Sequence, residues 1–404
     1  MAVVAPFQAW VPPAALSAEI ASVPYDVVDT PEARALADGH PLSFLHVIRP
    51  EIDLPEGTDL YSDAVYEQAR ANLDRWLADV PYVRGERPAL FVYRLIRDGR
   101  SQTGVVGGCS VDEYDEGRIA IHERTRQGKE DDRTRHVVTM RCQAEPIFLA
   151  YRADPRIDAL VADVVRGPPL FDFTAVDGVR HTVWSVVEPD AITAAFEAVP
   201  TLYVADGHHR TKSASRARAT LRDANPSHTG REPYNAVLSV VFPDDQLEIL
   251  PYNRVVTDLG GRTPGQVLAE IGARFPLTPG ADPEPREPHR FAVHADGSWY
   301  GFTIPPQGDG VIERLDVSLL QEQVLAPIFG IHDPRLDPRI DFVGGIRGTV
   351  ELERRAAACG GVAFSLYATT MAELFAVADS GAIMPPKSTW FEPKLRSGLF
   401  VHRI

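Results

Sequence analysis

The stretch from residue 202 to residue 222 constrains the fold of this chain more than any other. Residues 202–205 form a short apolar run typical of a buried strand, and Asp206-Gly207 interrupts it. Residues 208–222 contain neither glycine nor proline, so they predict a helix. The sequence therefore predicts a strand, a tight turn and a helix, with a cluster of polar side chains at the turn.

The remaining segments predict a mixture of strands and helices. Residues 59–79 have apolar side chains at helical spacing, and residues 89–111 predict a hairpin around Asp98-Gly99. Residues 146–151 predict a buried strand, and residues 235–256 predict two strands paired with each other. Because these elements do not alternate in a regular βαβ rhythm, we expect the fold class to be α+β (mixed α/β).

The length of the chain indicates more than one folding unit. A chain of 404 residues is longer than a single hydrophobic core usually supports. Five of the fifteen residues 276–290 are proline, which is typical of a linker or a long loop. We expect an N-terminal α+β lobe at 1–118, a core at 119–260 that contains the turn, and a C-terminal α+β lobe at 261–404.

The composition excludes several classes of protein. The formal net charge of -15 argues against a general nucleic-acid binder, whose surface would be basic. No apolar run approaches the length of a membrane span, and the N-terminus lacks the basic region of a signal peptide. The three cysteines are far apart in the sequence and suit a reducing compartment. We expect a cytoplasmic protein with no nucleic-acid or membrane partner, and the oligomeric state stays open.

The turn at 206–211 has the chemistry of an anion site. Gly207 permits a positive φ, and the helix that follows presents unpaired amide groups at its N-terminus, where anions bind. Arg210 would add a bidentate phosphate donor, and we expect it to contribute charge rather than packing. His208 and His209 could bind phosphate oxygens or move a proton, and Asp206 could bind Mg²⁺ or act as a base. The structural alternative is an Asp-capped helix with solvated polar residues. A zinc site is less favoured, because no third ligand is spaced nearby.

A second cluster, at residues 122–136, is almost wholly polar. A mobile charged flap of this kind could hold a polyphosphate through its basic residues and the accompanying Mg²⁺ through its carboxylates. The alternative is a solvated face. The charged members are Glu123, Arg124, Arg126, Lys129, Glu130, Asp131, Asp132, Arg133 and Arg135.

Two shorter stretches carry polar residues in unusual settings. Lys387-Ser388-Thr389 follows two prolines and resembles an anion-binding turn, although a structural corner is equally compatible with it. Tyr25-Asp26 follows Pro24 and is either a turn or part of a site. No GxSxG elbow occurs, which disfavours a serine hydrolase of that class.

These four stretches together resemble a known family. VPYDVV, HERTRQGKEDDR, ADGHHR and MPPKSTWFEPK match, in order and over nearly the full length, the large bacterial family catalogued as domain of unknown function 1015. Some of its members are diphosphate-dependent free-serine kinases. The DGHHR turn is also similar to the phosphate-binding turn of ParB-like proteins, sulfiredoxins and archaeal nucleotide-dependent serine kinases. Two departures from the family pattern are Thr211-Lys212 after the turn and Val23 before Pro24.

The resemblance implies a fold and an activity. The fold is a ParB/sulfiredoxin-like phosphate-binding core with additional α+β lobes. The activity is that of a small-molecule kinase, which makes O-phosphoserine from free L-serine, or phosphorylates a related hydroxy amino acid, with diphosphate, ADP or ATP as donor. Two rival classes are a ParB-like nucleotide-binding regulatory protein and a non-catalytic metabolite-binding protein.

The resemblance also assigns roles to the polar residues. The transferred phosphate would be held by His208, His209, Arg210 and Thr211. The rest of the donor would be held by Arg126, Lys129, Arg133, Lys387 and Ser388. The substrate would contact Tyr25 and Asp26, and Mg²⁺ would bind Asp131 or Asp132. Glu123 or Asp206 would accept the hydroxyl proton, and we favour Glu123 because the cations beside Asp206 would make it a weak base.

Overall fold

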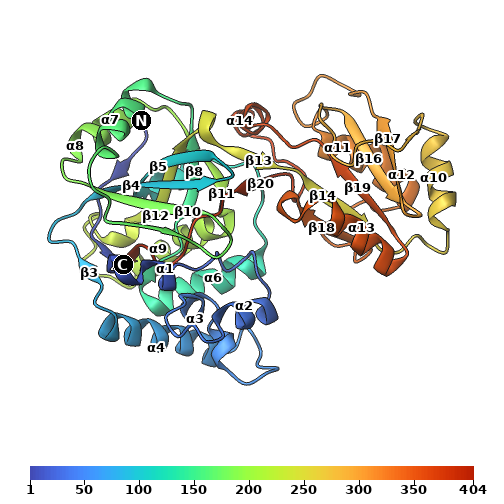
Figure 1. Ribbon diagram of the computed structural model, residues 1–404. Helices are drawn as coiled ribbons and strands as arrows, with labels where there is room; N and C mark the ends of the chain where they lie inside the picture. The colour runs from blue at the N-terminus through green and yellow to red at the C-terminus, as the bar shows by residue number, and fades with distance from the viewer. The chain divides into compact units, whose positions relative to one another are not determined.

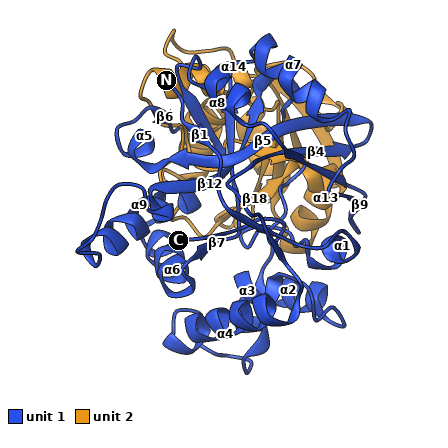
Figure 2. Ribbon diagram, turned by 90° about the vertical axis from the view of Figure 1, so that its left-hand side faces the viewer, with its two compact units in different colours: residues 1–121, 125–247, 393–404 blue, residues 122–124, 248–392 orange.

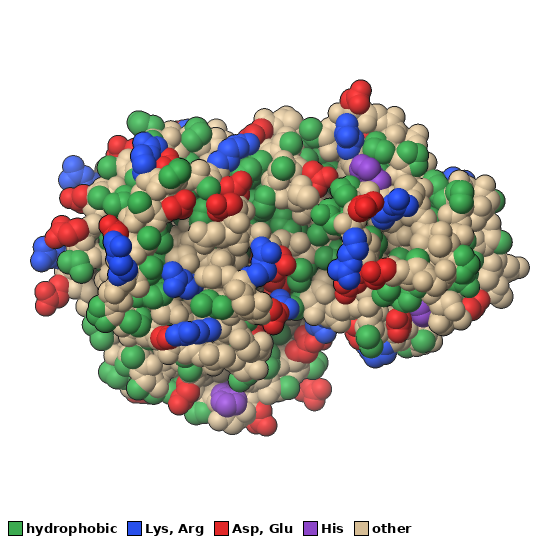
Figure 3. Space-filling model, turned by 45° about the horizontal axis from the view of Figure 1, so that its top comes forward, with side chains coloured by type: hydrophobic (Ala, Val, Ile, Leu, Met, Phe, Trp, Pro, Cys, Tyr) green, Lys and Arg blue, Asp and Glu red, His purple; other side chains and the backbone are tan.

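The computed structural model describes residues 1–404. It divides into two compact units, as expected of a chain that is too long for one hydrophobic core (Figure 2). Unit 1 consists of Met1–Ile121, Thr125–Leu247 and Pro393–Ile404. Unit 2 consists of His122–Arg124 and Glu248–Glu392. None of the helices combines the length and the apolar character that crossing a membrane would require. On the face that Figure 3 draws, basic and acidic side chains are interspersed.

Unit 1 is built around a nine-stranded sheet (Figure 1). The strands run in the order β6-β11-β8-β12-β5-β4-β10-β9, and β1 pairs with β5. Their bounds are β1 Val4–Ala5, β4 Leu90–Arg97, β5 Arg100–Ser110, β6 Ile119–Ala120, β8 Ile147–Tyr151, β9 Phe171–Thr174, β10 Arg180–Val186, β11 Leu202–Asp206 and β12 Ala236–Pro243. A second, four-stranded sheet consists of β3 Val83–Arg84, β2 Ala9–Val11, β21 Val401–Arg403 and β7 Cys142–Gln143.

The helices of unit 1 lie on the faces of its large sheet and in a separate helical layer. The helices α7 (Pro155–Val164) and α8 (Asp190–Phe196) contribute to the core of the large sheet. Another core lies under α2 (Thr30–Ala37), α3 (Leu45–Ile48) and α4 (Asp63–Asp79), where Phe44 packs on Trp76. The remaining helical segments are Ala14–Leu16, α1 Ser17–Ile20, Pro50–Asp53, α5 Val111–Asp115, α6 Gln127–Met140, α9 His208–Asp223, Pro233–Asn235 and Asp244–Gln246.

Unit 2 contains a six-stranded sheet in the order β15-β17-β16-β19-β14-β18. Its strands are β14 Tyr252–Val256, β15 Thr278–Pro279, β16 Arg290–Ala295, β17 Ser298–Thr303, β18 Ile340–Gly344 and β19 Val362–Leu366, and a separate pair is formed by β13 Glu248–Leu250 and β20 Trp390–Glu392. One face of the sheet packs against Leu352 and Ala356 of α13. The helical segments are α10 Pro264–Gly272, α11 Asp316–Leu320, a π-helical turn Gln321–Leu325, α12 Ala326–Phe329, Gly345–Arg347, α13 Gly348–Cys359 and α14 Met371–Asp379.

Much of the predicted organisation is confirmed, including the α+β fold class. The hairpin forms between β4 and β5, where Asp98 and Gly99 both have a positive φ, as a tight two-residue turn requires. The helix α4 and the strand β8 also lie where the sequence predicts them.

The predicted pairing of two strands within 235–256 is wrong. β12 pairs with β5 and β8, whereas β13 and β14 belong to unit 2 and pair with strands there. An apolar run specifies that a strand is buried, but it does not specify which strand lies beside it.

The units also do not coincide with the three predicted lobes. Residues 1–118 and most of 119–260 share one sheet, and the proline-rich residues 276–290 lie inside unit 2 rather than at a boundary.

Candidate functional site

The predicted strand, turn and helix are confirmed in unit 1. β11 ends at Asp206, Gly207 adopts the left-handed conformation (φ 94, ψ 29), and α9 begins at His208. The N-cap residue is Gly207, which has no side chain to accept hydrogen bonds from the helix. The first amide groups of α9 therefore point out of its N-terminal end. A Cβ atom at Gly207 would lie 3.1 Å from Cζ of Arg210. Glycine is therefore required here both by the backbone conformation and by the close approach of the guanidinium.

Asp206 does not cap α9, contrary to the structural alternative that the sequence left open. Its Oδ1 accepts a hydrogen bond from the amide of Gly207 (2.9 Å), and its Oδ2 accepts one from Nζ of Lys394 (3.0 Å). Burial raises the pKa of Asp206, but Lys394 and Arg210 lower it by more, so that it lies well below its usual range.

Lys394 is a functional candidate that the sequence reasoning did not assign. It stands in the MPPKSTWFEPK stretch, and residues 393–404 return to unit 1 after the chain has completed unit 2. Its ammonium group and Asp206 form an ion pair in which Lys394 is 11% and Asp206 is 27% exposed. The stretch that contains Lys394 was recognised in the sequence. Its contact with Asp206 was not, because the two residues are 188 positions apart.

Arg210 is buried, which corrects the expectation that it contributes charge rather than packing. Its Nη1 donates to the carbonyl of Pro146 (2.7 Å), and its Nη2 lies 3.9 Å from Oδ2 of Asp206. The Nε atom is buried and has no hydrogen-bond partner. A buried donor is normally satisfied, so the missing acceptor of this N–H is one that a ligand oxygen could supply.

Carboxylates surround the guanidinium of Arg210. Burial lowers the pKa of Arg210, whereas Asp26, Asp206 and Glu145 raise it, and the net shift is upward. Glu145, which the sequence reasoning did not assign, accepts a hydrogen bond from the amide of Tyr25 (3.2 Å). Burial raises the pKa of Glu145 above its usual value. The structure therefore brings Tyr25 and Asp26, both predicted substrate contacts, into the surroundings of Arg210.

The other residues of the turn make local contacts. The ring Nε2 of His209 accepts a hydrogen bond from the amide of Arg126 (3.0 Å), so the turn contacts the segment that precedes α6. The hydroxyl of Thr211 donates to the carbonyl of Gly207 (3.0 Å) and is buried within the first turn of the helix. Thr211 thus stabilises the turn itself, and its role as a phosphate ligand is not supported by its orientation.

The predicted flap is largely a helix, which corrects the expectation of a mobile segment over 122–136. Residues Gln127–Met140 form α6, and this helix packs against α9. The carbonyl of Glu130 accepts from the hydroxyl of Ser213 (3.3 Å), and Arg216 of α9 forms ion pairs with Glu130 and Asp131. Some of the charges are therefore paired, because partners from other elements meet them. Arg124, Arg126 and Lys129 remain exposed.

Asp131 and Asp132, one or the other of which was predicted to bind Mg²⁺, both pair with other side chains. Oδ1 of Asp132 accepts from the hydroxyl of Tyr66 (2.9 Å), and its Oδ2 accepts from Nε of Arg133 (2.8 Å). Asp131 pairs with Arg216 at 2.6 Å. Mg²⁺ is bound by oxygen ligands in near-octahedral geometry, and both oxygens of Asp132 and one oxygen of Asp131 already pair with other side chains. Neither unit by itself holds three histidine, cysteine or carboxylate side chains placed to bind a metal ion.

Arg133, predicted to hold the donor, is also largely buried. Besides Asp132, it contacts the carbonyl of Ile48, and its guanidinium lies 4.3 Å from the ring centroid of Tyr25. Its pKa is raised, since the neighbouring carboxylate and phenol outweigh the effect of burial. This arrangement makes Arg133 a support for Tyr25 in the interior of unit 1.

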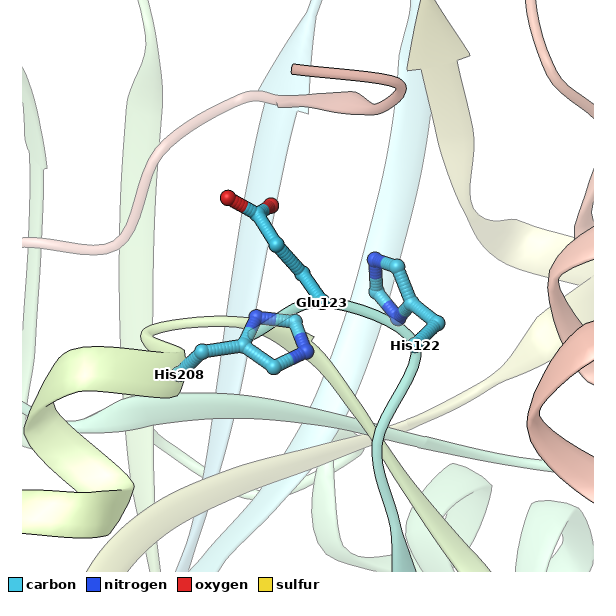
Figure 4. Close-up of side chains that lie close together, drawn as sticks. All are labelled: His122, Glu123 and His208. Atoms are coloured by element: carbon cyan, nitrogen blue, oxygen red, sulfur yellow. The ribbon is translucent and has the colours of Figure 1, made fainter. Parts of the chain in front are cut away.

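Three predicted residues belong to unit 2. Lys387 has a left-handed backbone (φ 57), and its ammonium lies 5.3 Å from the ring centroid of Tyr252. The hydroxyl of Ser388 donates to the carbonyl of Pro385 (2.6 Å). Glu123 stands beside His122, whose ring Nε2 lies 3.3 Å from the hydroxyl of Thr389. Figure 4 shows His122 and Glu123 on the segment that follows β6, and His208 at the start of α9.

The covalent chain limits how far Glu123 can lie from the turn. Arg126, whose amide contacts His209, follows Glu123 by three residues. Three residues span at most about 11 Å between Cα atoms. The chain connection to Arg126 therefore limits the distance between Glu123 and the turn.

Comparison with known proteins identifies a family match. The family described as "Protein of unknown function (DUF1015)" matches residues 4–318. No curated protein matches the chain.

Several solved structures are similar at low identity. A C-terminally truncated SbnI from Staphylococcus aureus has a TM-score of 0.40 and 13% identity, over 72% of this chain and 85% of that one. A free serine kinase in complex with AMP has a TM-score of 0.35 and 14% identity, over 72% of this chain and 91% of the other. A conserved hypothetical protein from Pyrococcus furiosus has a TM-score of 0.35 and 14% identity, over 73% and 93%. These similarities are too distant to support an argument about activity, and the ParB-like core stays a prediction.

Proposed function

This chain belongs to DUF1015, a family of unknown function, and we propose that it is a small-molecule kinase. The reaction would transfer a phosphoryl group from diphosphate, ADP or ATP to the hydroxyl of free L-serine or a related hydroxy amino acid. The product would be O-phosphoserine or its analogue. The main support for this proposal is the N-terminal end of α9. There Arg210 approaches Gly207 closely, and Lys394 contacts the preceding residue, Asp206.

The start of α9 supports phosphate binding for three physical reasons. The helix N-terminus carries a partial positive charge, and its first amides lack acceptors within the helix. Arg210 has a buried Nε without a hydrogen-bond partner. The ammonium group of Lys394 pairs with Asp206 beside the start of α9 and adds a positive charge there. Phosphoryl transfer depends chiefly on such positioning and charge neutralisation.

Glu123 is the better candidate for the general base. Asp206 has a strongly lowered pKa and both of its oxygens accept hydrogen bonds, so it would be a weak base. In the proposed step the hydroxyl oxygen of the acceptor attacks phosphorus and its proton passes to Glu123. The bond from phosphorus to the leaving group breaks, and the leaving group is phosphate, AMP or ADP according to the donor.

The proposed reaction uses neither Asp131 nor Asp132 as a ligand of Mg²⁺, because both carboxylates pair with other side chains. A magnesium ion that accompanies the donor would be held by the donor's own phosphate oxygens. Arg126 and Lys129, both exposed, would contact the same phosphates from the segment beside the turn.

Phosphorus NMR tests the proposal directly. Serine and related hydroxy amino acids are incubated with diphosphate, ADP or ATP, each with and without magnesium. A phosphate-ester signal with one pair of substrates is the expected result. If no pair gives an ester, the chain is not a kinase of this class, and binding of the same compounds without transfer would assign it to the metabolite-binding proteins. Retention on DNA at moderate salt would favour the ParB-like alternative instead.

Two variants then separate the candidate bases. Glu123→Gln should lower turnover by about two to four orders of magnitude with little change in donor affinity, because the amide keeps the size and removes only proton acceptance. Asp206→Asn is the matched comparison and should act mainly through the loss of its ion pair with Lys394. The opposite pattern would make Asp206 the base, and two nearly normal enzymes would refute both assignments.

A further inference from the structure

Unit 2 buries an arginine on β14, the strand next to one edge of its six-stranded sheet. Arg254 lies on β14 and is 4% exposed. Its guanidinium lies 4.8 Å from the ring centroid of Phe342 on the neighbouring strand. Its Nη1 donates to the carbonyl of Tyr252, and its Nη2 lies 3.5 Å from the carbonyl of Pro386. Both of these partners are neutral main-chain oxygens.

The other buried arginines of the chain differ from Arg254 in one respect. Arg133 pairs with Asp132, Arg210 with Asp206, and Arg396 with Asp177. No carboxylate pairs with Arg254, and burial lowers its pKa to about 10. A buried charge without a counter-charge is strongly unfavourable, and proteins normally pair it. The missing negative charge is most simply supplied by a bound anion.

A second cation lies on the same face of the sheet. Side chains two positions apart in a strand point to the same side, so Tyr252 and Arg254 share one face. The ammonium of Lys387 lies above the ring of Tyr252, and Lys387 follows Pro386, whose carbonyl Arg254 approaches. The opposite face of the sheet is occupied by α13.

The backbone at Lys387 is strained in a way that favours a functional role. It has a φ of 57, a conformation that few residues other than glycine and asparagine adopt readily. Such strain tends to occur where a side chain must be held in one place for a ligand. The strained residue thus presents its ammonium on the face that also holds the uncompensated guanidinium.

We propose that Arg254 and Lys387 form a binding site in unit 2 for a compact oxyanion, either a phosphate or the carboxylate of an amino acid. The planar guanidinium suits two parallel hydrogen bonds to such a group, and the ammonium supplies a second charge. Both residues belong to unit 2, and the proposal does not depend on the kinase assignment, because it is tested by binding.

Thermal unfolding of the full chain, with inorganic phosphate or L-serine as the probe, tests the site. The wild-type midpoint should rise with the concentration of one of the probes, since a ligand that binds only the folded state stabilises it. Arg254→Met should bind that probe about 10- to 100-fold more weakly, in line with the loss of hydrogen bonds to a charged group. Lys387→Asn, which tolerates the left-handed backbone, should weaken it as well.

The behaviour without ligand separates this proposal from a structural role. Arg254→Met removes an uncompensated buried charge, so its midpoint in the absence of anion should equal or exceed that of the wild type. The control is Arg354→Met, an exposed arginine of the same unit, which should leave the response to the probe unchanged. A response to phosphate alone identifies a phosphate site, and a response to serine alone identifies a carboxylate site. The proposal is overturned if Arg254→Met is less stable without anion and keeps the full response, or if neither probe shifts the wild type.

Discussion

Replacing Arg210 by methionine should destabilise unit 1 strongly. Methionine keeps much of the side-chain volume but removes the charge that faces Asp26, Asp206 and Glu145. The variant therefore isolates electrostatics and hydrogen bonding from the loss of packing. It also removes the hydrogen bond from Nη1 to Pro146.

The magnitude follows from the geometry of the ion pair. At 3.9 Å, the Arg210–Asp206 attraction is about 4 kcal/mol for an effective dielectric constant near 20. In the wild type, the cost of removing the guanidinium from water offsets part of this attraction. Removing one partner leaves uncompensated carboxylates, and breaking buried pairs in this way lowers the free energy of unfolding by about 3 to 5 kcal/mol. The side chain of Arg210 is only 8% exposed, so solvent screens little of this effect.

Urea unfolding followed by circular dichroism, at several pH values, measures the loss. In the variant, Glu145 loses a neighbouring cation, so its already raised pKa should rise further. The folded state then binds a proton more readily than the unfolded state, and the deficit relative to the wild type should shrink between pH 7 and pH 5. Arg222→Met is the control on the same helix, since Arg222 is 44% exposed and should change stability by less than about 0.5 kcal/mol. A deficit below about 1 kcal/mol, or one independent of pH, would refute the electrostatic reasoning.

Two further predictions concern unit 1. Gly207→Ala should lower the free energy of unfolding by more than Gly117→Ala. Both glycines have a positive φ, which costs alanine about 1 to 2 kcal/mol, but only at Gly207 would the new Cβ displace a guanidinium. Equal losses of unfolding free energy in chemical denaturation would show that the side chain of Arg210 can move away from the new Cβ at little cost. Burial lowers the pKa of His136 to about 3. Between about pH 6.5 and pH 3 the unfolded chain therefore binds a proton that the folded chain does not. The contribution of His136 to the free energy of unfolding falls by about 1.4 kcal/mol for each pH unit as the pH drops through this range. His136→Gln should reduce that slope by one proton, and an unchanged slope would contradict the assignment.

Local signals in the sequence were sufficient for the turn and the hairpin. The apolar run before Asp206, the glycine after it and the absence of helix breakers each act over a few residues, and the structure has the strand, turn and helix where they predict it. The same holds for Asp98-Gly99, whose conformational preferences belong to the two residues themselves.

Features that depend on distant partners could not be predicted. The charged residues 127–136 are helical because partners such as Tyr66 and Arg216 meet them, and nothing near α6 in the sequence indicates those partners. The contact of Lys394 with Asp206, the burial of Arg210 and the strand partners of β12 have the same origin. Each is decided by how elements pack after they form.

The return of residues 393–404 to unit 1 has a consequence for the order of folding. These residues supply β21, which pairs with β2 and β7, and they supply Lys394 and Arg396. They leave the ribosome only after every residue of unit 2 has been synthesised. Unit 2 can therefore fold while unit 1 still lacks one strand and the lysine that pairs with Asp206, and the candidate phosphate site is completed last.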